Sequence, residues 1–131
     1  VFDLQTIKRH EQALELFDLL PIAAFDDKLK REIYYWKAES NYELEHYDRA
    51  ALLYMKSAKA GDETMTDLWA QSARFKASDA LLKAGLYDDA QYAYGELLNI
   101  TSSDSRKRLI RQKLQHIQLL RSSEASGPGQ G

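Results

Sequence analysis

Apolar residues recur at steps of three and four along most of the chain, which is the period of an amphipathic α-helix. The first such stretch runs from Leu4 to Leu20 and stops at Pro21. The second runs from Asp26 or Asp27, either of which can serve as an N-cap, to about Leu44. It is apolar or aromatic around much of its circumference, so we expect neighbours on two sides of it. Since β-branched residues are sparse, the pattern predicts an all-α protein.

The remaining pattern predicts four more helices, over residues 47–60, 64–85, 88–100 and 101–121. Thr64-Met65-Thr66-Asp67 and Thr101-Ser102-Ser103-Asp104 each place an acid three residues after a threonine, a relative of the capping box that opens a helix. Gly61 can supply the left-handed cap that closes a helix, and Gly85, which lacks a Cβ, suits a tight turn between two helices. In the last helix Ile110, Leu114 and Ile117 form a single stripe, so one face is expected to dock and the other to meet water.

Two segments fall outside these helices. Residues 22–25 are apolar, so we expect this connection to lie beneath neighbouring helices. Residues 122–131 consist largely of Ser, Gly and Pro and have little to bury, so we expect a disordered tail after a domain of residues 1–121.

Part of the pattern repeats. Ala13, Ala50 and Ala90 lie 37 and 40 residues apart, and Phe17, Tyr54 and Tyr94 keep the same spacings. Tyr47 and Tyr87 each stand where one predicted helix ends and the next begins. A period of 20 to 50 residues marks a stacked repeat, here a helical hairpin. The order is half a unit, two full units and a terminal helix.

These residues resemble the tetratricopeptide repeat over about residues 10–120. The matching positions are Ala77-Ser78, Leu81, Gly85, Tyr87, Ala90 and Tyr94 in one copy, and Tyr34, Ala38, Tyr47, Ala50 and Tyr54 in the other. Glu45 stands where a turn glycine is usual. The resemblance implies a right-handed α-solenoid of about two and a half tetratricopeptide-like hairpins with a C-terminal capping helix, and packing roles for Ala38, Tyr47, Ala50, Tyr54, Ser78, Gly85, Tyr87, Ala90 and Tyr94. The spacing is also similar to bacterial cell-envelope members, which implies a periplasmic or envelope location.

In this family the first helix of each hairpin lines a concave groove that binds proteins or peptides. The matching residues here are Glu32, Tyr35, Glu39, Tyr42, Glu43, Ser72, Phe75, Lys76, Asp79 and Lys83. The resemblance therefore implies a scaffold that binds a peptide or partner helix, with aromatic anchors and charges that set the register. The other interpretation is that further repeats cover part of this strip.

Composition narrows the function classes. A net charge of −2 argues against a protein that tracks phosphates, so no nucleic-acid partner is expected. The basic run Arg106, Lys107, Arg108 and Arg111 is interpreted first as a solvated face and second as a patch for nucleic acid or an acidic partner. No apolar run approaches the ~20 residues that span a bilayer.

Residues suited to catalysis or metal binding are not grouped. The chain has no cysteine, and His10, His46 and His116 lack a second ligand at metal spacing. The acid pairs at helix starts are explained by the helix dipole. We therefore expect no enzyme activity and no cofactor.

Two other roles remain open. One is oligomerisation or a structural segment of a larger envelope assembly, and the other is an accessory domain of an enzyme. Because Val1 is not a methionine, we expect a processed product or a fragment.

Overall fold

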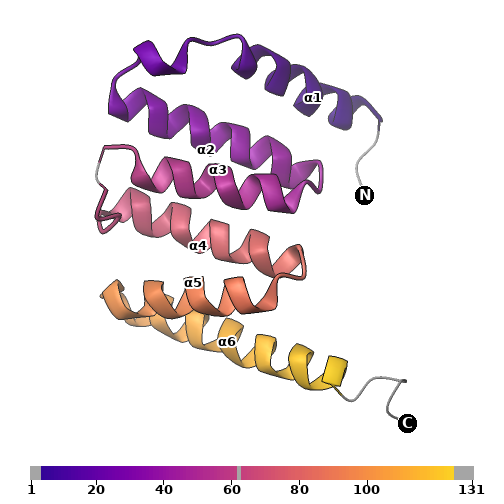
Figure 1. Cartoon of the computed structure of the whole chain (residues 1–131), viewed down its shortest axis with the longest axis vertical. Coiled ribbons are helices and arrows are strands. Elements are labelled where there is room, and N and C mark those ends of the chain that lie inside the picture. The colour runs from indigo at the N-terminus through magenta and orange to yellow at the C-terminus, as the bar shows by residue number, and fades with distance from the viewer. Residues whose placement is uncertain (1–3, 62, 126–131) are drawn as a thin grey trace.

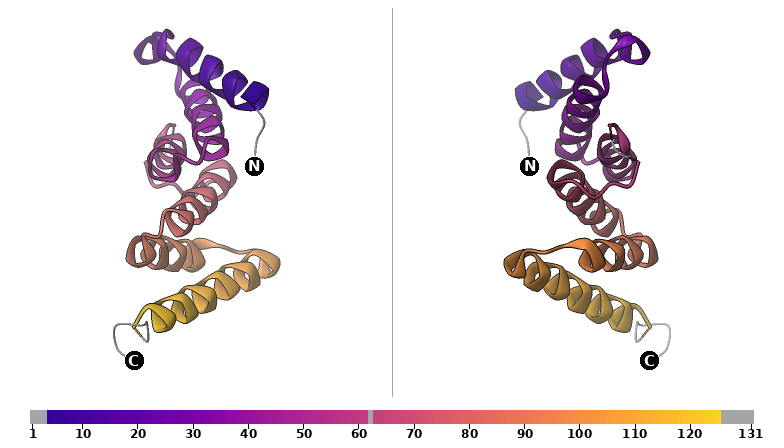
Figure 2. Two further views of the ribbon diagram at one scale, coloured as in Figure 1. Left: turned by 90° about the vertical axis from the view of Figure 1, so that its right-hand side faces the viewer. Right: turned by 90° about the vertical axis from the view of Figure 1, so that its left-hand side faces the viewer.

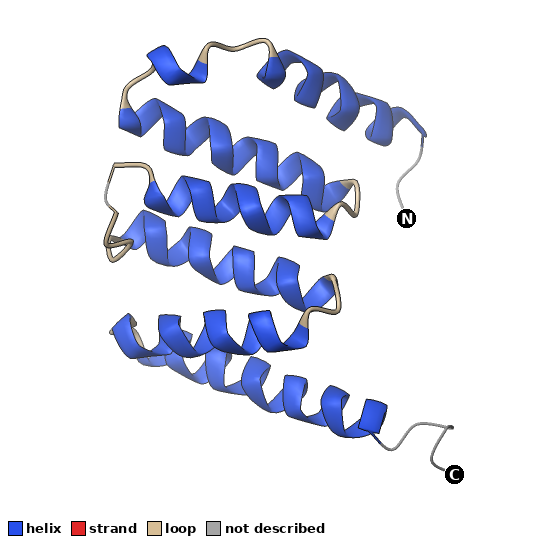
Figure 3. Ribbon diagram, viewed as in Figure 1, coloured by secondary structure: helices blue, strands red, loops and turns tan. Residues whose placement is uncertain are grey.

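A computed structural model describes residues 4–61 and 63–125. It contains six α-helices and one short 3-10 helix, and no strand occurs in the described ranges (Figure 3), which confirms the all-α prediction. The elements are α1 (Leu4–Asp18), η1 (Ile22–Ala24), α2 (Asp27–Glu43), α3 (Tyr47–Lys59), α4 (Leu68–Lys83), α5 (Tyr87–Ile100) and α6 (Asp104–Ala125).

The helices form a single stack in chain order, with α1 at one end and α6 at the other (Figure 1). Each helix packs mainly on the next one along the chain. Viewed along the helices, α3 and α5 lie on one side of the stack and α2 and α4 on the other (Figure 2). The result is a repeat-like fold in which the pairs α2–α3 and α4–α5 follow one another.

The first helix of each pair begins after an aspartate that serves as its N-cap. Asp26 accepts a hydrogen bond from the backbone nitrogen of Leu29 at 2.8 Å, and Asp67 accepts one from Ala70 at 2.7 Å. The expectation that Thr64 opens α4 is wrong, because its hydroxyl bonds to that of Thr66 and the helix begins only at Leu68. A carboxylate next to the first turn is the stronger cap, since it also complements the helix dipole.

The two pairs turn through the same backbone motif. Glu45, after α2, and Gly85, after α4, both have left-handed backbone, with φ of 64° and 80°. The backbone nitrogens of His46 and Glu45 bond to the carbonyls of Asn41 and Tyr42, and the equivalent bonds follow α4. This is the Schellman motif, for which glycine is the usual residue.

The core is built from small residues at the helix crossings. Ala38, Ala50 and Tyr54 are buried in the first pair, and Ser78, Ala90 and Tyr94 hold the same places in the second. Small side chains let the backbones approach, and each tyrosine fills the space beside them. Tyr47 and Tyr87 are half-buried at the turns. At the end of the stack Ile110 and Ile117 of α6 are fully buried against α5, with Leu114 partly buried beside them.

Two expectations about connecting segments need correction. Residues 22–25 comprise η1 and its C-cap Phe25. Ile22 and Phe25 are partly buried, but Ala23 and Ala24 are exposed, so the segment is covered only in part. Helix α6 continues to Ala125, so residues 122–125 are helical rather than part of a disordered tail. Ser, Glu and Ala at these positions are compatible with a helix that is already nucleated. Residues 126–131 lie outside the described residues.

Candidate functional site

A pocket of about 180 Å³ opens between α2 and α4. It is lined by Glu39, Tyr42, Glu43, Tyr54, Lys76 and Asp79. Helical spacing explains the grouping, since residues 42 and 43 lie one turn after residue 39 on α2, and residue 79 lies one turn after residue 76 on α4. Tyr54 reaches the pocket from α3.

Glu39 is the centre of the bonding in this pocket. Its carboxylate accepts a hydrogen bond from the Tyr54 hydroxyl and another from Lys76 Nζ at 2.8 Å. Burial, followed by the hydrogen bond to Glu39, raises the pKa of Tyr54, so its hydroxyl keeps its proton. Desolvation acts to lower the pKa of Lys76, but hydrogen bonds to Glu39 and Tyr35 outweigh it and the net pKa is raised. Lys76 therefore stays charged.

The same arrangement recurs around Asp79. The Tyr94 hydroxyl donates to Asp79, and Lys113 of α6 lies 3.5 Å from the same oxygen. In both copies the tyrosine follows the acid by 15 residues. Burial, followed by the hydrogen bond to Asp79, raises the pKa of Tyr94. In each copy an acid on one helix is thus joined to a tyrosine on the next helix and to a lysine on the helix after that: α2, α3 and α4 in the first copy, and α4, α5 and α6 in the second.

Tyr42 and Glu43 form the part of the pocket that is less committed to internal bonds. The Tyr42 ring is half-buried and meets the edge of Tyr47, with ring centroids 5.1 Å apart. Desolvation, followed by the charge of Asp79, raises the pKa of Tyr42. Glu43 has no ion pair within the part of the chain that the structure describes. Three carboxylates and one ammonium group line the pocket, which leaves an excess of two negative charges.

The structure brings together half of the expected groove residues. Glu39, Tyr42, Glu43, Lys76 and Asp79 line the pocket, whereas Glu32, Tyr35, Ser72, Phe75 and Lys83 do not. The two aromatic rings of the second group pack inward instead. Tyr35 contacts Tyr54 at 5.6 Å and Phe75 contacts Tyr94 at 6.0 Å, in each case edge to face.

One pocket residue was not expected from the sequence. Tyr54 was assigned to packing, and its ring is indeed buried, but its hydroxyl lies in the pocket wall. The signal that could have found this role was the acid 15 residues before it, which is repeated at Asp79 and Tyr94.

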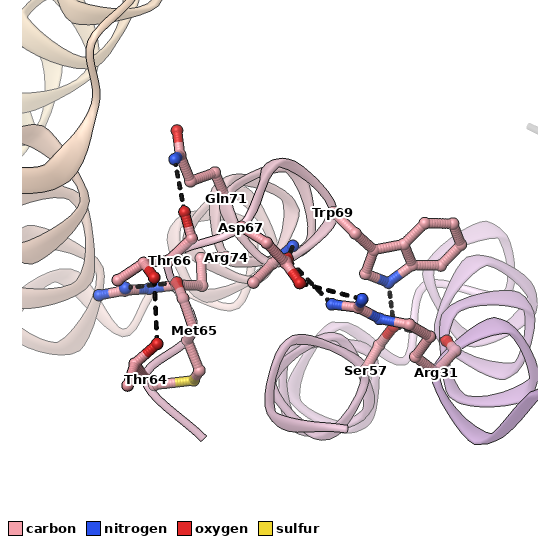
Figure 4. A network of polar contacts seen from close by, with 10 residues as sticks. Arg31, Ser57, Thr64, Met65, Thr66, Asp67, Trp69, Gln71 and Arg74 are labelled. Atoms are coloured by element: carbon pink, nitrogen blue, oxygen red, sulfur yellow. Dashed lines mark hydrogen bonds and ion pairs between the residues drawn. The ribbon is translucent and has the colours of Figure 1, made fainter. Parts of the chain in front are cut away.

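A polar network joins α2, α3 and α4 near the starts of α2 and α4 (Figure 4). Arg31 of α2 makes two hydrogen bonds, of 3.0 and 3.1 Å, to the carboxylate of Asp67, which caps α4. Ser57 of α3 donates to the carbonyl of Arg31 at 2.6 Å and accepts from the indole nitrogen of Trp69 at 2.9 Å. The hydrogen bonds from Arg31, followed by the one from the Ala70 amide, lower the pKa of Asp67.

One residue of the basic run on α6 contacts α4, and two others are exposed to solvent. The guanidinium of Arg106 lies 5.8 Å above the ring of Phe75, a cation–π contact that ties α6 to α4. Arg108 and Arg111 are exposed.

Comparison of the chain with protein-family models, curated proteins and solved structures finds no match. In residues 4–61 and 63–125, no helix combines the length and apolar content needed to cross a bilayer. The same residues contain no group of three or more His, Asp or Glu side chains placed to hold a metal ion.

Proposed function

We propose that this chain is a non-catalytic protein-interaction module of the tetratricopeptide type, in which α2 and α4 present a groove to a peptide or partner helix. The observation that carries the proposal is the pocket between these helices, with its acidic excess and its tyrosines. The repeated placement of equivalent residues in α2–α3 and α4–α5 supports the same assignment, since stacked pairs leave one long side open to partners.

The chemistry of the pocket favours a partner with a basic side chain next to an apolar one. Glu43 offers a carboxylate without an ion pair among the described residues, and Tyr42 offers an aromatic surface beside it. Glu39 and Asp79 already bond to a tyrosine and lie beside a lysine. They are therefore expected to attract a basic partner through their negative charge more than through direct contact. A lysine or arginine of the partner is thus expected to pair with Glu43 and lie along Tyr42.

These bonds also support a binding role over a catalytic one. An acid–base pair needs a carboxylate that can reach a substrate proton. Glu39 and Asp79 each accept a tyrosine hydroxyl and lie beside a lysine, so their oxygens already have partners within the protein.

The test is selection of a phage-displayed library of random peptides against the folded chain. Selected peptides are expected to share a basic residue next to an aromatic or aliphatic one. Glu43→Lys should weaken their binding at least tenfold, because it reverses a charge at the contact. Asp89→Lys, the same change at an exposed site on α5, should leave it unaltered.

Tyr42→Ala should weaken the same peptides by about 1 kcal/mol or more, as expected for an aromatic anchor, while the helical circular dichroism is kept. Because Tyr42 also packs on Tyr47, the thermal unfolding of the Tyr42→Ala variant is measured in parallel, to detect a loss of stability. Peptides that bind both Glu43→Lys and Tyr42→Ala as well as the parent chain would show that the partner lies elsewhere.

A second candidate role, self-assembly, is favoured by exposed surfaces of the end helices α1 and α6 rather than by the groove.

A further inference from the structure

The two end helices occupy complementary places in the pattern of pairs. Lys76 of α4 bonds to Glu39 of α2, and Lys113 of α6 approaches Asp79 of α4, so α6 lies beside α4 as α4 lies beside α2. Helix α6 therefore stands where the first helix of a pair would stand. Within the described residues, no helix follows it as α3 follows α2.

Helix α1 occupies the opposite place. Its Ala13 and Phe17 keep the spacing of Ala50 and Tyr54, which belong to the second helix of a pair. Unlike those residues, Ala13 and Phe17 are only partly buried, and α1 has no fully buried side chain. In the described part of the chain it packs mainly on α2 and has no first helix on its other side.

Both open faces carry leucines in contact with solvent. On α1, Leu16 is 65% exposed, and Leu19, which directly follows the helix, is 80% exposed. On α6, Leu119 is 70% exposed and Leu109 is also exposed, on the side away from the buried Ile110 and Ile117. A terminal cap is expected to be polar on its outer face. The glutamines of α6 fit that expectation, but its leucines make the face a mixed one.

The two helices carry exposed charges of opposite sign in parts of their length, and the first half of α1 also exposes the basic Lys8 and Arg9. The later half of α1 carries exposed Glu11 and Glu15, whereas the first half of α6 carries exposed Arg108 and Arg111. None of these four side chains has an ion pair among the described residues. If α6 and α1 lie antiparallel, as successive helices of the stack do, the acidic half meets the basic half.

We infer that a second copy of this chain docks its α1 on the outer face of α6, so that the two helices complete a pair across the interface. The contact is heterologous, because the two copies use different faces. Each added copy leaves the same two faces free at its ends, so the assembly is open and grows with concentration. The role is independent of the groove between α2 and α4.

The first test is sedimentation velocity over a range of concentrations at low and high salt. The average mass is expected to rise beyond twice the 15.0 kDa of one chain, and to fall back as salt screens the charges. Leu119→Ser should raise the protein concentration at which the chain assembles at least tenfold, whereas Leu68→Ser, at an exposed position on α4, should not. A mass that stays at one chain at all concentrations overturns the inference.

Charge reversal tests the partner faces directly. Arg108→Glu/Arg111→Glu and Glu11→Lys/Glu15→Lys should each abolish assembly, and an equal mixture of the two variants should restore it. The mixture restores both kinds of contact, acidic α6 on basic α1 and basic α6 on acidic α1. If either variant still assembles alone, or if the parent chain stops at a dimer, the contact is not between α1 and α6. Circular dichroism of each variant confirms that it is folded.

Discussion

The hydroxyl of Tyr54 donates a hydrogen bond to the carboxylate of Glu39, 15 residues earlier on the neighbouring helix. Tyr94 makes the same bond to Asp79. Each bond joins a buried ring to an ionised group, and hydrogen bonds to charged groups contribute more than neutral ones.

Tyr54→Phe and Tyr94→Phe should each lower the free energy of unfolding by about 1.5–3 kcal/mol, because the ring still fills its place but the carboxylate loses a donor. The two losses should be similar, since the two sites are equivalent. Tyr92→Phe, at an exposed position on α5, is the control and should change stability by less than about 0.5 kcal/mol. Urea unfolding measures all three. Equal, small effects at all three positions would contradict a stabilising role for the bonds.

Stability should fall at alkaline pH because of the same tyrosines. Their pKa is raised in the folded state, while an unfolded tyrosine ionises near pH 10, at about its ordinary pKa. Above that pH the unfolded chain binds fewer protons than the folded one, so their contribution is complete below about pH 10 and is lost as pH rises. The loss approaches about 1.4 kcal/mol per pH unit for each tyrosine.

The measurement is urea unfolding from pH 8 to pH 11, together with phenolate absorbance. Tyr54→Phe/Tyr94→Phe should show a flatter decline than the parent chain. If all eight tyrosines of the folded protein ionise near pH 10, this account is wrong.

Asp67 should respond at the acid end. Asp67→Asn keeps an oxygen that can cap α4 but loses the charge that pairs with Arg31, whose side chain is only 15% exposed. We expect it to cost about 1 kcal/mol, because the carboxylate itself is 40% exposed and water screens the pair. Asp67→Ala also loses the cap and should cost about 1 kcal/mol more.

The pH dependence has a definite sign. The pKa of Asp67 is lowered in the folded state, so its contribution is present above about pH 4, the ordinary range of an aspartate, and is lost as pH falls through the folded pKa. Thermal unfolding of parent and Asp67→Asn should therefore converge as the pH falls below 4. A constant difference down to pH 2 would assign the effect to packing instead.

The two left-handed turns supply a matched pair of opposite changes. Glu45→Gly should stabilise the protein by about 0.5–1 kcal/mol, because it removes the cost of a left-handed glutamate, partly offset by a more flexible unfolded chain. Gly85→Ala should destabilise it by about 1 kcal/mol. A Cβ at Gly85 meets no atom within 4 Å, so the loss comes from the backbone alone. Thermal melting of both variants provides the comparison, and a shift of the same sign in both would be inconsistent with equivalent turns.

Capping residues and the spacing of small side chains were sufficient to predict most of the helices and turns. Asp26 and Gly85 act through neighbours in the chain, and the spacing of Ala50 and Ala90 predicts their burial. They were insufficient at Asp67. The choice of this residue over Thr64 as the cap accompanies its pairing with Arg31, which lies 36 residues away and has no local signal.

The candidate site divides in the same way. Helical spacing places Tyr42 and Glu43 on the α2 wall of the pocket, and Lys76 lies on the facing α4 wall. It cannot distinguish a ring that faces the pocket from one that turns inward, so Phe75 was placed in the groove although it packs against Tyr94. The direction of such a ring depends on the space that the neighbouring helix leaves for it, and this space is defined only in the folded structure.

The bidentate pairing of Arg31 with Asp67 has a consequence for how the protein melts. In stacked repeats each unit is stabilised mainly by its neighbours, and weak junctions let units unfold one at a time. Here the junction between α2–α3 and α4–α5 is bridged, besides its shared core, by an arginine of the first pair and the residue that caps the first helix of the second. Loss of order in either pair removes the partner that the other one needs. Because this ion pair adds to the buried core that Ala50 and Ala51 share with Ala77 and Ala80, the two pairs are expected to unfold in one cooperative transition.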